Sequence, residues 1–270
     1  MIDSMAPPLY LRHMKAFRLL APLWILTSLP MWAQNGAANA TTPANSQSVD
    51  SMLPNQRAFL NLSQEQRDEF VKIFREGNRL FSQKRIFEAL DTAVAARKIF
   101  PESPEVYNLM GSCYVEMRSF DKALASFQKA ATLTTRTNNI LFNIGEVYFV
   151  TKQWQKSMQT FEQVLRTLPA NDIYMGRLAE FKILLCKIKL DKVDEAKILA
   201  EKYDFLDDSP YHYFAKAAIE YQAGNLSEAE QWLARAARIF RSQELLSPWH
   251  DTLVEFGYIK SFYGDEEAAP

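Results

Sequence analysis

Large apolar residues recur along this chain at a regular interval of about 34 residues between positions 70 and 169. Within each interval they lie three, four or seven positions apart, which places them on one face of a helix. Gly77, Gly111 and Gly145 occupy the same place in successive intervals. Glycine weakens a helix by about 1 kcal/mol, so its recurrence indicates that two helices pack closely there. The pattern predicts stacked pairs of helices, because neither helix of a pair buries its apolar face alone.

Further columns of residues keep the same register. They are Ile73, Tyr107 and Leu141; Leu80, Tyr114 and Tyr148; Ile86, Phe120 and Trp154; Ala89, Ala123 and Ser157; Ala93, Phe127 and Phe161; Ala96, Ala130 and Val164; Pro101, Thr135 and Pro169. These columns resemble the tetratricopeptide repeat, a helix-turn-helix unit with a large apolar residue, a glycine, an aromatic residue, two small residues and a closing proline. The resemblance implies an all-α fold, namely a right-handed α-solenoid of tetratricopeptide-like repeats with a C-terminal capping helix.

The register loosens after the third unit. Ala196 lies farther beyond Ser157 than the regular interval allows, and Ala229 then follows Ala196 at close to that interval. A longer first helix in the fourth unit accounts for the slip, and a change in the orientation of the units is the alternative. Ser247 and Pro248 predict the start of a last helix that closes the open end of the stack.

These signals define a repeat domain that begins at Ser63. Ser63 and Gln66 form a capping box, so the first helix of the domain is expected to start at Gln64. The predicted boundaries are 63–262 for the domain, about 70–103, 104–137, 138–171, 172–209 and 210–243 for the repeats, 248–262 for the cap helix and 263–270 for a disordered tail.

The N-terminal segment has the pattern of a secretory signal peptide. Arg12, Lys15 and Arg18 precede an apolar run of about 15 residues that ends at Ala33, shorter than the roughly 20 residues that span a bilayer. We expect residues 1–33 to be removed and residues 34–62 to form a flexible linker. An uncleaved membrane anchor is the alternative. The sequence therefore predicts an exported protein, periplasmic or secreted, with inner-membrane anchoring as the second possibility.

Charge and cysteine content narrow the function further. The formal net charge of the chain is −1, so the sequence lacks the excess positive charge that is typical of nucleic-acid-binding proteins. The two cysteines, Cys113 and Cys186, fall in the first helices of different units and have no C-x-x-C partner. We expect both to be buried free thiols that pack as small apolar side chains.

Candidate catalytic groups are few. His212 and His250 are the only histidines outside the predicted signal peptide, and each lacks a metal-ligand partner three or four residues away. No phosphate-binding, dinucleotide, nucleophile-elbow or zinc-protease motif is present. The sequence therefore predicts no catalytic site, no metal and no cofactor, and a protein that is not an enzyme.

One charged stripe has two interpretations. Arg235, Arg238 and Arg241 lie three residues apart on the second helix of the fifth unit. Such a stripe is typical of a solvated outer face, and docking of an acidic partner or lipid headgroup is the alternative.

The resemblance also implies a binding surface, because first helices of tetratricopeptide repeats line a concave groove that takes extended peptides or a partner helix. Carboxamides suit a peptide backbone, and phenylalanines supply shallow apolar pockets. Packing of these phenylalanines within the helices is the alternative. Some family members clamp a carboxylate with a lysine here, but this chain has Phe74 and Asn108 instead. The candidate partner-binding residues are Phe74, Asn78, Phe81, Asn108, Ser112, Asn139, Phe142, Asn143, Glu146 and Phe149.

These expectations combine into one functional hypothesis. The chain is predicted to be a non-catalytic scaffold of the bacterial cell envelope that holds a partner protein or peptide in its groove. A membrane-tethered structural subunit is the first alternative, and a carbohydrate-binding or enzyme accessory protein is the second. The second alternative requires His212, Tyr211, Tyr221 or Trp249 to converge with carboxylates in a pocket.

Overall fold

A computed structural model describes residues 52–260 of the chain. The predicted signal peptide, most of the predicted linker and the predicted tail lie outside these residues. Within them the chain forms twelve α-helices and no strand. None of these helices is both long and apolar enough to cross a membrane.

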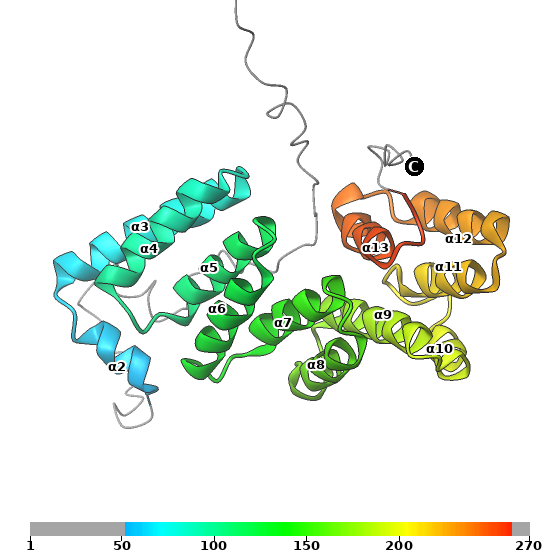
Figure 1. Cartoon of the computed structure of the whole chain (residues 1–270), viewed down its shortest axis with the longest axis horizontal. Helices are drawn as coiled ribbons and strands as arrows, with labels where there is room; N and C mark the ends of the chain where they lie inside the picture. Colours follow the sequence, from blue (N-terminus) through cyan, green and yellow to red (C-terminus); the bar gives the residue numbers. More distant parts are fainter. Residues whose placement is uncertain (1–51, 261–270) are drawn as a thin grey trace, which may run out of the picture.

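Ten of the helices form five consecutive hairpins that stack side by side into a curved solenoid (Figure 1). This is the predicted all-α repeat architecture. The hairpins are α3 (Gln64–Ser82) with α4 (Ile86–Ile99), α5 (Pro104–Glu116) with α6 (Phe120–Thr132), α7 (Asn138–Val150) with α8 (Trp154–Thr167), α9 (Ile173–Lys189) with α10 (Val193–Ala200), and α11 (Tyr211–Ala223) with α12 (Leu226–Ile239). Two further helices, α2 (Pro54–Leu60) and α13 (Gln243–Phe256), flank them.

The glycine and alanine columns lie where the two helices of a hairpin cross. Ala89, Ala123 and Ala229 are fully buried. An added Cβ at Gly111 would lie 2.5 Å from the ring of Phe127, and one at Gly145 would lie 2.9 Å from the ring of Phe161. The glycines therefore make room for an aromatic ring of the second helix, which is the packing reason that the sequence indicated.

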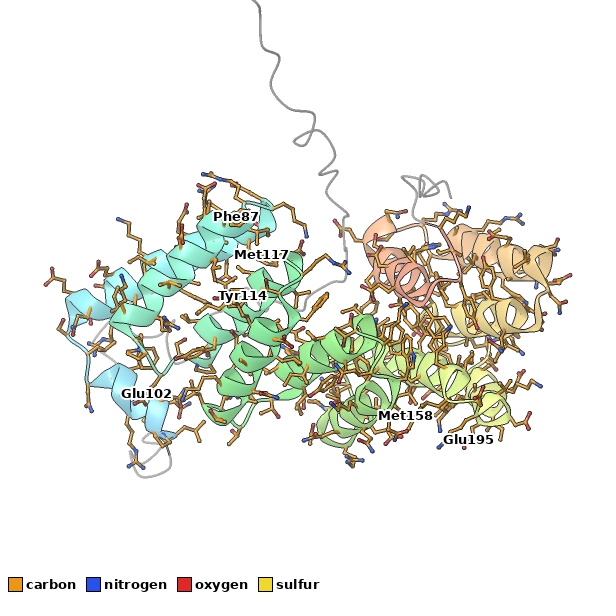
Figure 2. All side chains as sticks on the ribbon, in the orientation of Figure 1. Phe87, Glu102, Tyr114, Met117, Met158 and Glu195 are labelled. Carbon is orange, nitrogen blue, oxygen red and sulfur yellow. The ribbon has the colours of Figure 1, made fainter. Side chains whose placement is uncertain are left out.

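The turn inside each hairpin contains a residue in the left-handed region. These residues are Lys84, Arg118, Lys152, Asp191 and Gly224. The first three are evenly spaced along the sequence. Asp191 comes later than that spacing predicts, and the interval from Asp191 to Gly224 is again close to the regular one. The positions of the turns thus follow the sequence pattern, which is regular over the first three units and changes in the fourth. Figure 2 shows Phe87 and Met117 at the edge of the stack that holds the first two turns, and Glu102 at the opposite edge, where one hairpin joins the next.

Replacing Lys152 with glycine is expected to raise the free energy of unfolding by about 0.5–1 kcal/mol, because only glycine adopts this conformation without steric cost. Lys152 is exposed and has φ near 59°. The reverse change, Gly224→Ala, is expected to lower it by about 1 kcal/mol, since an added Cβ meets no atom within 4 Å and only backbone strain remains. Urea denaturation of both variants measures this. Equal stability of both variants would contradict the assignment of strain to these turns.

The N-terminal boundary of the domain differs in part from the prediction. The capping box at Ser63 is confirmed: Ser63 Oγ accepts from the Gln66 N–H at 3.1 Å, and α3 begins at Gln64. Helix α2, however, lies within residues predicted to be a linker. It forms because Phe59 packs against Phe70 and Phe100, with ring centroids 5.8 and 5.4 Å apart, and is 2% exposed. The prediction of a flexible linker is wrong for this helix.

The last helix also differs from the predicted cap. It begins at Gln243 rather than Pro248, because Ser242 Oγ accepts from the Leu245 N–H at 3.3 Å and starts the helix one turn earlier. Pro248 lies inside α13. Instead of stacking on α12 as the next first helix would, α13 folds back onto α9. In Figure 1 it lies beside α11 and above α9.

Candidate functional site

The structure divides the predicted binding residues into buried and half-buried groups. Asn108 and Asn139 are half-buried and reach solvent. The buried residues are Phe74, Asn78, Phe81, Ser112, Phe142, Asn143, Glu146 and Phe149.

All four phenylalanines are buried between helices, so the prediction that they form open apolar pockets is wrong. Phe74 stacks on Phe70 with ring centroids 6.0 Å apart. Phe142 meets Phe161 at 5.1 Å, and Phe149 packs between Trp154 of α8 and Phe256 of α13. The alternative given by the sequence, packing within the helices, is the one observed.

The carboxamides of neighbouring first helices are connected. Asn143 on α7 donates from Nδ2 to Asn108 Oδ1 on α5 at 3.0 Å. Asn78 on α3 donates instead to the carbonyl of Phe74, within its own helix, at 3.1 Å. The buried Oδ1 atoms of Asn78 and Asn143 accept no hydrogen bond from residues 52–260. A row of amides therefore follows α3, α5 and α7, with unused acceptors on Asn78 and Asn143, and Asn108 brings the row to the surface.

Helix α13 covers the corresponding faces of the later units. Trp249, fully buried, packs on Phe181 of α9 and Phe214 of α11 with ring centroids 5.3 and 5.7 Å apart. Phe256 packs on Phe149 of α7 at 6.1 Å. The first helices α7, α9 and α11 thus contact a helix of their own chain.

A buried ionic cluster joins α13 to this surface. Lys182 on α9 is 1% exposed, and its Nζ lies 2.8 Å from Glu146 Oε1 on α7 and 3.8 Å from Glu255 Oε2 on α13. Apart from Lys182, no group within the described residues donates a hydrogen bond to the carboxyl oxygens of Glu146 and Glu255. One ammonium group therefore compensates two buried carboxylates. The prediction that Glu146 lies in an open groove is wrong, and the repeat spacing marks neither Lys182 nor Glu255 as part of a site.

Burial raises the pKa of each acid of this cluster. It raises the pKa of Glu255 to about 8, with Lys182 opposing the rise and Glu146 adding to it. Burial also raises the pKa of Glu146, against the charge of Lys182. Asp251, one turn before Glu255 on α13, has its pKa raised to about 7, again chiefly by burial. The docked α13 therefore holds protons near neutral pH that an unfolded chain would release.

Stability is expected to fall as the pH rises from about 5 to about 8, because the folded chain binds more protons than the unfolded chain in this window. Each extra proton contributes about 1.4 kcal/mol per pH unit. Urea denaturation of the wild type and of Glu255→Gln across this window tests the effect, since the other titrating groups are common to both. The glutamine variant should gain stability relative to the wild type as pH rises; parallel curves would contradict the cluster's role.

The cysteines and His250 lie in packed, apolar surroundings. Cys113 and Cys186 are buried free thiols, as predicted, and burial raises the pKa of each to about 12. Burial lowers the pKa of His250, whose ring meets Phe214 edge-on at 5.0 Å. Within residues 52–260 no group of three His, Cys, Asp or Glu side chains is placed to hold a metal ion.

Comparison with known proteins agrees with this geometry. Residues 104–135 match a sequence profile described as the tetratricopeptide repeat. The fold is similar to that of TTC0263 from Thermus thermophilus, with a TM-score of 0.52 and 19% identity over 68% of this chain and 99% of that one. Residues 104–135 are a tetratricopeptide repeat, and the described chain has the tetratricopeptide repeat fold. The same repeat fold is shared with a protein from Parabacteroides merdae ATCC 43184, with a TM-score of 0.51 and 18% identity over 71% of this chain and 75% of the other.

Curated relatives match little more than a third of this chain. A BBSome complex member BBS4 homolog of Drosophila melanogaster is 26% identical over 103 residues, 38% of this chain and 20% of the relative. Hsp70-Hsp90 organizing protein 1 of Glycine max is 26% identical over 96 residues, 36% of this chain and 17% of the relative. The chain thus spans about a fifth of the length of the curated relatives it matches. Tetratricopeptide repeats in general are non-catalytic scaffolds that mediate protein–protein interactions.

Proposed function

We propose that this tetratricopeptide repeat protein is an exported, non-catalytic scaffold that binds an extended segment of a partner protein along the first helices α3, α5 and α7. The hydrogen bond between Asn143 and Asn108 carries this proposal. It holds Asn108 in a fixed orientation at the surface and leaves its amide N–H groups directed away from Oδ1, where a peptide carbonyl can accept from them. Asn139, also half-buried, lies one turn from Asn143 on the same helix.

The position of α13 limits the extent of this surface. Because α13 occupies the first helices of the later hairpins, a partner segment has access to α3, α5 and the start of α7 only. With the phenylalanines buried, recognition here rests on backbone hydrogen bonds and on nearby charges such as exposed Arg75 and the ion pair of Lys84 with Glu116. This chemistry favours an extended polar segment over an amphipathic helix.

Photocrosslinking in the native cells tests the surface. A photoreactive phenylalanine analogue replaces Asn108 in one variant of the full chain and Gln128, exposed on the outer helix α6, in a matched control. The proposal expects a discrete crosslinked partner at position 108 that is absent at position 128. The proposal fails if position 108 gives no crosslink, or if both positions give the same one.

Export to the periplasm is the second part of the proposal, with an inner-membrane anchor as the alternative. Export is supported by the three basic residues near the N-terminus and by the short apolar run that follows them and ends at Ala33. N-terminal sequencing of the protein recovered from cell fractions separates the two possibilities. A mature chain that starts at Gln34 in the soluble periplasmic fraction supports export with cleavage, and an intact N-terminus in the membrane fraction supports the anchor.

A further inference from the structure

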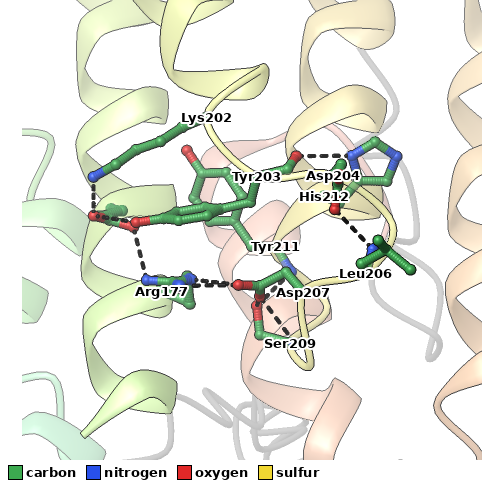
Figure 3. A network of polar contacts seen from close by, with 10 residues as sticks. Arg177, Lys202, Tyr203, Asp204, Leu206, Asp207, Ser209, Tyr211 and His212 are labelled. Atoms are coloured by element: carbon green, nitrogen blue, oxygen red, sulfur yellow. Dashed lines mark hydrogen bonds and ion pairs between the residues drawn. The ribbon is translucent and has the colours of Figure 1, made fainter. Parts of the chain in front are cut away.

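The connection between α10 and α11 is held firmly by side chains of α9 (Figure 3). Arg177 donates to Asp207 Oδ2 from both Nε and Nη2, at 3.0 and 2.9 Å. Its guanidinium group lies 3.5 Å from the ring centroid of Tyr203, whose hydroxyl donates to Glu180 at 3.1 Å. Asp207 also accepts from the backbone N–H of Ser209 at 3.1 Å. These contacts attach the connection between α10 and α11 to α9.

The tip of this connection presents apolar side chains to solvent. Phe205 and Leu206 are 67% and 74% exposed. The backbone N–H of Leu206 donates to Asp204 at 2.9 Å, which fixes the tip (Figure 3). Asp204 and Asp208 flank the apolar pair and are exposed. Residues 204–208, called the acidic loop below, thus combine an apolar centre with a negative rim.

Helix α12 also exposes an apolar side chain, but the charges around it are positive. Arg235, Arg238 and Arg241 are exposed, and Ile239 among them is 55% exposed. Arg235 lies 4.4 Å over the ring of Trp232, and none of the three arginines forms an ion pair within residues 52–260. These four residues, Arg235, Arg238, Ile239 and Arg241, are called the basic face below.

The acidic loop and the basic face belong to one region of the surface. His212 joins them: its Nδ1 lies 3.0 Å from the carbonyl of Tyr203, beside the loop, and its ring meets Trp232 of α12 at 5.6 Å. Tyr213, next in sequence, contacts Phe240 at 6.1 Å, just before Arg241. Both features therefore lie toward the edge of the stack where α11 begins and α12 ends.

We propose that a second copy of this chain docks on this region about a two-fold axis, so that the acidic loop of each copy meets the basic face of the other. A surface with adjacent, complementary halves is self-complementary under a two-fold rotation, since each half finds its opposite on the partner. Docking would bury Phe205, Leu206 and Ile239 and pair charges that have no partner within the described part of one chain. This interface goes beyond the proposed peptide-binding function and uses none of its residues.

Sedimentation equilibrium of the full chain over a range of concentrations tests this interface. The wild type is expected to pass from one chain to two. Asp208→Arg and Arg238→Asp should each weaken dimerisation at least about tenfold, because each places like charges opposite one another. The double variant with both changes should recover at least part of the affinity. Leu206→Ser should weaken dimerisation without any change in charge.

A matched control separates this interface from a general effect of charge. Arg166 is the penultimate residue of α8, as Arg238 is of α12, and it is exposed. Arg166→Asp should leave the dimer unchanged, and circular dichroism should show all variants to be folded. A wild type that stays a single chain, association that neither charge reversal affects, failure of the double variant to recover, or growth beyond two chains would each overturn the proposal.

Discussion

Replacing Lys182 with methionine is expected to lower the free energy of unfolding by about 3–5 kcal/mol above pH 8, where the buried acids are ionised and would be left without their counter-charge. Lys182 is 1% exposed and, within residues 52–260, provides the one ammonium that contacts both Glu146 and Glu255. Protonation of the two acids would offset part of the loss, so the effect should shrink as the pH is lowered. Urea denaturation at pH values below and above neutrality measures both the loss and its pH dependence.

Lys189 provides the control on the same helix. It is exposed and lies over the ring of Phe256 at 4.6 Å, so Lys189→Met is expected to cost less than about 1 kcal/mol. Changing Glu146 to glutamine in the Lys182→Met background should recover part of the lost stability, because it removes one of the uncompensated charges. A Lys182→Met variant as stable as the wild type above pH 8 would show that the cluster does not hold α13 in place.

Gly111→Ala is expected to lower the free energy of unfolding by a net amount of about 2 kcal/mol, although alanine favours a helix over glycine by about 1 kcal/mol. The added methyl group would lie 2.5 Å from the ring of Phe127, which is fully buried, so the ring would have to shift against its packed neighbours. The overpacking therefore outweighs the gain in helix propensity. Thermal and urea denaturation measure the net effect.

The equivalent change in the first unit is the comparison. At Gly77 the nearest atom to an added Cβ is the end of the Leu109 side chain, at 3.1 Å. A flexible leucine can give way, so Gly77→Ala should be close to neutral. If both alanine variants have the same stability, ring packing is not the reason for the glycine column.

The regular part of the fold could be predicted from local sequence, because every contact that defines a hairpin joins residues close in the chain. The regular register located the crossing points at Gly111 and Gly145, and Ser63 with Gln66 located the start of α3. The longer interval in the fourth unit also separates the turn residues Lys152 and Asp191. These features follow from spacing alone.

The candidate site could not be predicted in the same way, because its burial depends on partners far along the chain. Phe149 has the spacing of an open groove position, yet Phe256, from the last helix of the described chain, covers it. One local signal for the ionic cluster existed: Lys182 interrupts an apolar run from Phe181 to Cys186, where a charge needs a counter-charge. Which acids supply that charge depends on how α13 folds back, and no periodicity encodes this.

The return of α13 to the earlier helices also sets an order of events during synthesis. The first two hairpins contain only neighbouring contacts and can be completed as soon as they leave the ribosome. Trp249 cannot cover Phe181 and Phe214 until it has been synthesised. The contact between Lys182 and Glu255 forms later still, because Glu255 follows Trp249 in the chain. The fourth and fifth hairpins of a nascent or shortened chain that ends before α13 would therefore present their inner aromatic side chains to chaperones and proteases.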